Sequence, residues 1–299
     1  PSMAEASAMR NVTFAERIGS APVWVALALL AIGVLFYLGD FRALLVRWQT
    51  NEADSHGMLV AAVVPFLVWW QRDRLAFGRP GSLPALGGLL LASLAWVVAR
   101  AANVDLVQWV LLPAIVWFAL WAALGARSAR ALVFPIAYFL LAVPAWNLLL
   151  TPVFQWITVQ ACTLLLGLLG VQTFIEGANV QVPAGHFEIA GGCSGMNYLI
   201  VGVATALLFA FIERLAWRRT LAVVAVAIAI AMVSNWVRVT WVIYAGNATA
   251  MQSPLVADHA TFGWYVFAVA MVPFFFIARR IARGAPLPER PTPATSPAP

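Results

Sequence analysis

The chain of 299 residues is 63% hydrophobic and only 10% charged, whereas a soluble domain carries about 45–50% apolar and about 25% charged residues. This composition excludes a soluble enzyme, a disordered chain and a disulfide scaffold, and it predicts a polytopic membrane protein. All 18 basic residues are arginine and the net charge is +6. Because the arginines stand in short clusters between apolar runs, they do not indicate nucleic-acid binding.

Eight apolar runs approach the length of about 20 residues that a spanning helix needs. In chain order they cover residues 22–39, 57–71, 83–99, 106–124, 131–150, 194–212, 219–243 and 259–278. We therefore expect an all-α polytopic membrane protein with about eight transmembrane helices. The chain divides into an N-terminal segment 1–21, a membrane-embedded core 22–278, and a basic and then Pro-rich tail 279–299.

The distribution of arginine predicts the orientation. If the N-terminus is cytoplasmic and the eight spans alternate, every arginine falls on the inner side except Arg42, Arg47, Arg100 and Arg238. This bias places both termini in the cytoplasm. A ninth apolar stretch, 151–170, would reverse the bias if it crossed the membrane. It is therefore expected to be re-entrant or interfacial on the outer face, although a helix broken at Pro144 would rearrange this region.

Residues 171–190 alternate β-branched or aromatic residues with polar ones and contain Gly177 and Gly185. This pattern predicts a short β-hairpin on the outer membrane surface. Neither a metal site nor a cofactor is expected, because the three histidines lie on separate segments and no glycine-rich phosphate loop is present. Cys162 lies in an apolar stretch and is expected to be a buried thiol that forms no bridge with Cys193.

Polar residues at membrane depth are candidates for function because their burial in lipid is costly. Cys193 stands where the predicted hairpin meets a span, in the run Gly191-Gly192-Cys193-Ser194-Gly195. A helix N-terminus favours the thiolate form of such a cysteine. The alternative is a cysteine tolerated as a small packing residue.

Two further candidates lie near the same predicted depth. Arg238 shares a helix face with Asn235 and is on the wrong side to be an orientation signal, although it could also extend to the headgroups or form a salt bridge. His259 opens the last span, where a cap or interface role is the alternative. Since the three candidates stand at the outer ends of consecutive spans, a thiol, a guanidinium and an imidazole can converge on one cysteine acyl-transfer site.

At these residues the sequence resembles the exosortase/archaeosortase family, and the resemblance covers about residues 22–278. The matching residues are Gly192 to Gly195, Asn235 and Arg238, His259 with Gly263 and Phe267, and Ser55-His56-Gly57 before the second span. The resemblance implies a membrane-embedded cysteine protease or transpeptidase. Its substrates would be exported proteins with a C-terminal PEP-CTERM signal, which is a Pro-Glu-Pro-type motif followed by an apolar helix and an Arg-rich tail.

The resemblance also implies roles for individual residues. Cys193 would be the nucleophile, His259 the acid and base, and Arg238 the stabiliser of the thiolate or oxyanion. His56 is the rival imidazole and otherwise a substrate-binding group. The supporting residues would be Ser55, His186, Ser194, Gly195 and Asn235.

The family is tied to exopolysaccharide production in Gram-negative bacteria, and the exosortase A branch is the expected one. The expected location is the inner membrane with the site facing the periplasm, and the expected partners are PEP-CTERM proteins, membrane lipids and exopolysaccharide machinery. We expect the additional C-terminal domain of some members to be absent. The alternatives are a transporter of a polysaccharide precursor and a non-catalytic subunit of a secretion system, and the acceptor could be water or an amine.

Overall fold

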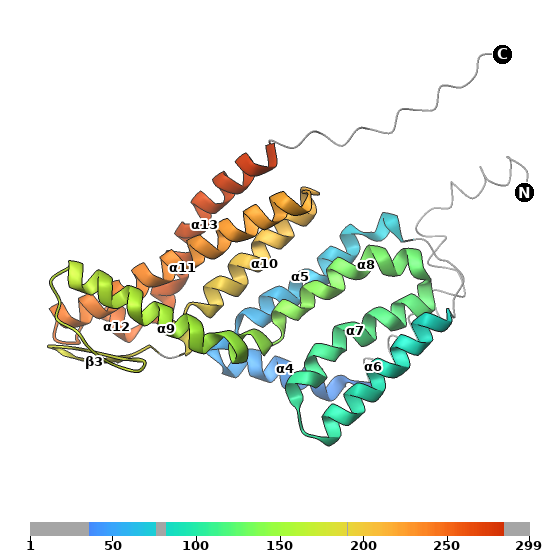
Figure 1. Ribbon diagram of the computed structural model, residues 1–299, viewed down its shortest axis with the longest axis horizontal. Helices are drawn as coiled ribbons and strands as arrows, with labels where there is room; N and C mark the ends of the chain where they lie inside the picture. The colour runs from blue at the N-terminus through green and yellow to red at the C-terminus, as the bar shows by residue number, and fades with distance from the viewer. Residues whose placement is uncertain (1–35, 76–81, 190, 284–299) are drawn as a thin grey trace, which may run out of the picture. The chain divides into compact units, whose positions relative to one another are not determined.

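The computed structural model describes residues 36–75, 82–189 and 191–283. The predicted N-terminal segment 1–21, most of the first predicted span and the end of the predicted tail lie outside the described residues. The chain divides into two compact units at Pro152, and each is described by itself (Figure 1).

The prediction of an all-α polytopic membrane protein with a small β element is confirmed. Six described helices are long and apolar enough to cross a membrane, and α10 is a shorter apolar helix. The six cover Glu52–Trp70, Leu83–Ala101, Asp105–Leu124, Ala145–Leu168, Trp217–Ala248 and His259–Arg283.

The N-terminal unit is a helical bundle. It contains α4 (Leu38–Thr50), η1 (Glu52–Asp54), α5 (His56–Trp70), η2 (Arg72–Arg74), α6 (Leu83–Ala101), α7 (Asp105–Leu124), α8 (Ala126–Tyr138) and η3 (Phe139–Ala142). α7 packs against both α6 and α8, and α5 packs against α8 and η3. Gly88 allows the close approach of α6 to α7, because a Cβ there would lie 2.2 Å from the ring of Phe118.

The predicted span 131–150 is not one helix. α8 ends at Tyr138, η3 follows, and a new helix, α9 (Ala145–Leu168), begins just after Pro144. Val143 is extended, as the residue before a proline prefers, and Pro144 suits a helix start because it has no N–H to leave unpaired. A helix therefore begins just after Pro144, inside the segment that we predicted to be one continuous span.

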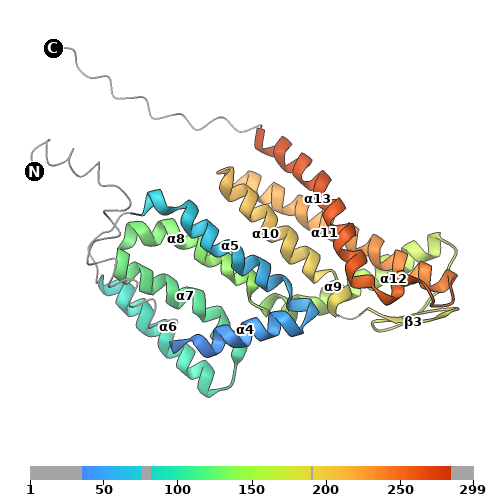
Figure 2. The same ribbon diagram turned by 180° about the vertical axis from the view of Figure 1, so that it is seen from behind.

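The stretch 151–170, predicted to be re-entrant or interfacial, is thus the larger part of α9. By length and composition α9 is able to cross a membrane. Figures 1 and 2 show α9 running across the direction of α10 and α11 and not alongside them. Its buried face, Val159, Cys162 and Leu166, packs on the sheet and on α11.

The C-terminal unit is built around α11 (Trp217–Ala248), which packs against α10 (Met196–Ile212) and α13 (His259–Arg283). Small residues allow these helices to approach closely, as is usual in membranes. A Cβ on Gly202 of α10 would meet the backbone of Ala227 at 3.5 Å. The short helix α12 (Pro254–Ala257) joins α11 to α13, and Asp258 caps α13 by accepting the N–H of Thr261 at 3.1 Å.

The predicted hairpin is a three-stranded antiparallel sheet in the order β1 (Phe174–Glu176), β2 (Asn179–Val182) and β3 (Gly185–Glu188). Glu176 pairs with Asn179 and Val182 pairs with Gly185, so two tight turns replace the single turn of a hairpin. Val180 and Val182 face the core, while Asn179 and Gln181 are exposed. The sheet therefore has one apolar face, which packs on α9 and α11.

Candidate active site

Cys193 ends a single 3-10 turn, η4 (Gly191–Cys193), just before α10. Gly195 caps the start of α10, and its φ of 92° is in the left-handed region that favours glycine. Within the turn the Ser194 hydroxyl donates to the carbonyl of Gly191 at 2.6 Å and accepts the N–H of Met196 at 3.3 Å. The predicted supporting residues Ser194 and Gly195 therefore shape the turn that carries the thiol.

Two buried side chains from neighbouring helices hold this turn. Asn235 of α11 donates to the carbonyl of Cys193 at 3.0 Å, and Thr158 of α9 donates to the carbonyl of Ser194 at 3.0 Å. The Asn235 amide also lies 3.5 Å from the Thr158 hydroxyl. Consecutive carbonyls are thus bound from two helices, which fixes the position of the sulfur. A Cβ on Gly195 would lie 2.9 Å from the Asn235 amide nitrogen, so this arrangement requires glycine.

Arg238 brings a positive charge to the sulfur. Its Nη2 donates to the Sγ of Cys193 at 3.6 Å, and its Nη1 lies 3.5 Å from the Asn235 amide oxygen. Arg238 is only 6% exposed, and its Nε has no hydrogen-bond partner among the residues that the structure describes. No carboxylate pairs with it among the described residues. A buried cation without a carboxylate is costly, and a thiolate at Cys193 would offset that cost.

The guanidinium has space because of Gly263 on α13. A Cβ there would lie 3.1 Å from the Arg238 Nε and 3.0 Å from the Tyr198 hydroxyl oxygen. Tyr198 donates its hydroxyl hydrogen to the carbonyl of Gly263, and its ring centroid is 5.7 Å from the guanidinium carbon. The aromatic face and the glycine together confine Arg238 beside Cys193.

His259 is the first residue of α13. Its Nδ1 lies 3.3 Å from the carbonyl of Val256. A carbonyl can only accept, so Nδ1 carries the hydrogen and the lone pair of the neutral ring is on Nε2. The backbone of α12 thereby sets the tautomer that a general base requires.

Cys193, Arg238 and His259 line one cavity of about 260 Å³. Its remaining walls are residues 186–189 of β3 and the sheet's end, Val239, Val242 and Ile243 of α11, and Met251 and Val256. The cavity is mostly apolar, and Cys193, Arg238 and His259 are among the few polar residues that line it. The structure therefore brings the three predicted site residues to one place, and His186, exposed on β3, joins them.

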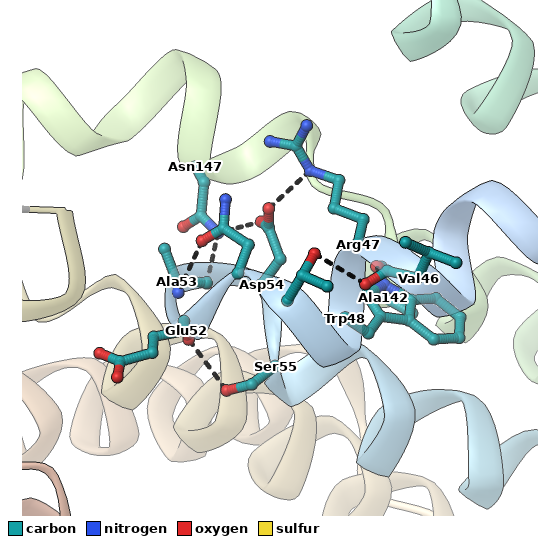
Figure 3. A network of polar contacts seen from close by, with 11 residues as sticks. Val46, Arg47, Trp48, Glu52, Ala53, Asp54, Ser55, Ala142 and Asn147 are labelled. Carbon is teal, nitrogen blue, oxygen red and sulfur yellow. Dashed lines mark hydrogen bonds and ion pairs between the residues drawn. The ribbon is translucent and has the colours of Figure 1, made fainter.

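Ser55 and His56 belong to the N-terminal unit. There Asp54, which is 1% exposed, accepts from the Nε of Arg47 at 2.6 Å and from the amide of Asn147 (Figure 3). Asn147 also donates to the carbonyl of Ala53. This polar cluster fixes the turn before α5, where His56 is 2% exposed.

Three residues that contact the site were not identified from the sequence. They are Thr158, Tyr198 and Gln155, which donates to the carbonyl of Ile189 at the end of the sheet. Gln155 and Thr158 are three residues apart in an apolar helix and so share a face. That spacing could have indicated two contacts with the site. A tyrosine in an apolar span gives no comparable indication in the sequence.

The fold and the site together define a polytopic membrane protein with a cysteine, an arginine and a histidine around one cavity. The chain belongs to the transmembrane exosortase family, whose model matches residues 48–276 and thus includes all three side chains. The predicted family is therefore confirmed, while the exosortase A branch stays a prediction. No curated protein and no solved structure matches the chain.

Proposed function

We propose that the protein is a membrane cysteine peptidase or transpeptidase that cleaves C-terminal PEP-CTERM sorting signals of exported proteins. The observation that carries the proposal is the cavity that Cys193, Arg238 and His259 share. A nucleophile, a base and a cation in one mostly apolar cavity are the groups that acyl transfer requires.

In the proposed reaction the Nε2 of His259 takes the proton from the Sγ of Cys193, and the thiolate attacks the scissile carbonyl. Arg238 donates to the oxyanion of the tetrahedral intermediate, which a preorganised donor stabilises. The intermediate collapses, the C–N bond breaks, and the leaving amine takes the proton from His259. A thioester on Cys193 remains until water or an amine attacks it and frees the thiol.

We further propose that the cavity opens toward the periplasm of a bacterial inner membrane. Support comes from the C-terminal unit. In this unit, Arg214, Arg218 and Arg219 lie at the α10–α11 connection, and Arg279, Arg280 and Arg283 lie at the end of α13. Both places are opposite the end that carries Cys193. Arginine favours the cytoplasmic side of membrane proteins, so the site falls on the outer side.

The test is mass spectrometry of the full chain after incubation with a peptide that carries a Pro-Glu-Pro motif and the start of an apolar helix. We expect a thioester adduct on Cys193 in the wild-type chain. Cys193→Ala should give neither adduct nor cleavage, and cells with this variant should accumulate unprocessed substrate.

Cys162→Ala is the matched control, because Cys162 is a free thiol that is fully buried and does not line the cavity. It should keep both the adduct and cleavage. Cleavage that persists in Cys193→Ala would overturn the proposal.

A further inference from the structure

The side of β3 that faces away from β2 borders the active-site cavity. Four consecutive residues, His186 to Ile189, line that cavity. Side chains alternate between the two faces of a strand: His186 and Glu188 are exposed, whereas Phe187 packs on the core. The cavity contacts residues whose side chains lie on both faces of β3. It must therefore run along the edge of the strand and not along one face.

The register shows which backbone groups are present at that edge. The N–H of Ile189 donates to the carbonyl of Ala178 at 3.0 Å, so these opposed residues form a hydrogen-bonded pair. Pairs alternate along an antiparallel ladder. The next hydrogen-bonded pair is therefore Phe187 and Val180. The two pairs on either side of it are not hydrogen-bonded: His186 with Gln181, and Glu188 with Asn179. The N–H and C=O groups of His186 and Glu188 therefore point away from β2, toward the cavity side.

The edge is held in a fixed position relative to Cys193. The N–H of Ala184, in the turn before β3, donates to the side chain of Asn247 on α11 at 3.2 Å. At the other end of β3, the carbonyl of Ile189 accepts from Gln155 of α9. α11 and α9 also carry Asn235 and Thr158, which bind the Cys193 turn. The same two helices thus position both the strand edge and the thiol.

We infer that the substrate binds as an extended strand that pairs with the free edge of β3 and thereby presents its scissile carbonyl to Cys193. This inference rests on the proposed function. Addition of a strand to an exposed edge provides main-chain hydrogen bonds that are independent of side-chain sequence. Here His186 and Glu188 each offer a backbone N–H and a backbone C=O. The two residues are about 7 Å apart, which matches the distance between every second residue of a bound strand.

A Pro-Glu-Pro motif suits this edge. Proline has no N–H, and residues two apart in a strand direct their backbone groups to the same side. When the backbone groups of both prolines face away from β3, their lack of an N–H costs no hydrogen bond with the edge. The N–H of the intervening glutamate then points at the edge. The spacing of the two prolines therefore permits pairing on one side only.

The test measures binding of fluorescent peptides to the full-length Cys193→Ala chain in detergent, so that turnover does not interfere. The peptides contain Pro-Glu-Pro and the next residues, with a single N-methyl group on one backbone amide. Methylation of the glutamate amide, or of the first residue after the motif, should raise Kd by roughly 2- to 10-fold, the value of one hydrogen bond. Methylation of the second residue after the motif should have a smaller effect, because its amide faces away.

On the protein side, Glu188→Pro removes an edge N–H that β2 does not use, and edge strands tolerate such prolines. Its Kd should exceed that of Glu188→Ala, which loses the same carboxylate but keeps the N–H. If Glu188→Pro does not fold, the peptide series still decides. Equal Kd values for all methylated peptides would overturn strand addition and leave the peptidase proposal intact. Failure of every peptide to bind would overturn both.

Discussion

Gly195 offers the sharpest test of how the thiol is positioned. In Gly195→Ala the backbone must keep a φ of 92°, which costs a residue with a Cβ about 1–2 kcal/mol. The new Cβ also lies 2.9 Å from the Asn235 amide nitrogen, while ordinary contact begins at 3.4 Å. Relief of this overlap requires a shift of about 0.5 Å in the turn or in Asn235, and it weakens the hydrogen bond to the Cys193 carbonyl, worth about 1 kcal/mol.

The expected total is a loss of about 2–3 kcal/mol in the free energy of unfolding. A displacement of 1 Å costs about 100-fold in rate in other enzymes, so a shift of about half that distance should lower kcat about tenfold. The assays are denaturant unfolding of the purified protein in detergent and peptide cleavage.

Gly170→Ala is the matched control. Gly170 also has a positive φ, 75°, but a Cβ there would have none of the described residues within 4 Å. It should lose only the backbone contribution of about 1–2 kcal/mol and keep its kcat. Equal kcat values for the two variants would refute the argument that contact with Asn235 positions the thiol.

Three other predictions test separate parts of the structure. Asn235→Ala should lower kcat at least tenfold with little change in KM, because the Cys193 carbonyl loses its donor; an unchanged kcat in peptide cleavage would contradict this. Asp54→Asn should lower the free energy of unfolding by about 2 kcal/mol, since it removes the nearly fully buried carboxylate that pairs with Arg47, and denaturant titration measures this. Gly57→Ala should destabilise the chain, because its Cβ would lie 2.2 Å from the indole nitrogen of Trp48. Gly87→Ala is the control and should raise the unfolding midpoint slightly, because its Cβ would have nothing within 4 Å in the described part of the chain. A midpoint for Gly57→Ala equal to or above that of Gly87→Ala would show that the packing argument is wrong.

Most of the fold could be predicted because apolar run length is a strong signal in membrane proteins. The predicted span 219–243 is part of α11 (Trp217–Ala248), and 259–278 is part of α13 (His259–Arg283). The region around Pro144 could not be predicted in the same way, since the residues on both sides are equally apolar. Hydropathy does not distinguish a helix that continues through a proline from one that begins there.

The residues of the candidate site could be identified from the sequence because each one borders or interrupts an apolar run. Cys193 and His259 flank apolar runs, and Arg238 interrupts one, so each is visible in the sequence. The third strand was missed because Pro183 and Ala184 form a turn without a positive-φ glycine between Val182 and Gly185. Thr158 was missed as a contact because the register of α9 against the Cys193 turn depends on packing, which sequence periodicity does not give.

The length of α11 has a consequence for the environment of the reaction. At 1.5 Å per residue its 32 residues extend about 48 Å, whereas the hydrocarbon core of a bilayer is about 30 Å thick. α10, with 17 residues, extends only about 26 Å. Unless α11 tilts strongly, its last turns rise beyond the acyl chains while its shorter neighbour does not. Turnover of the proposed substrate should therefore depend on lipid chain length. In a thicker leaflet the candidate active site would lie among the acyl chains, whereas in a thinner leaflet it would lie at the headgroups.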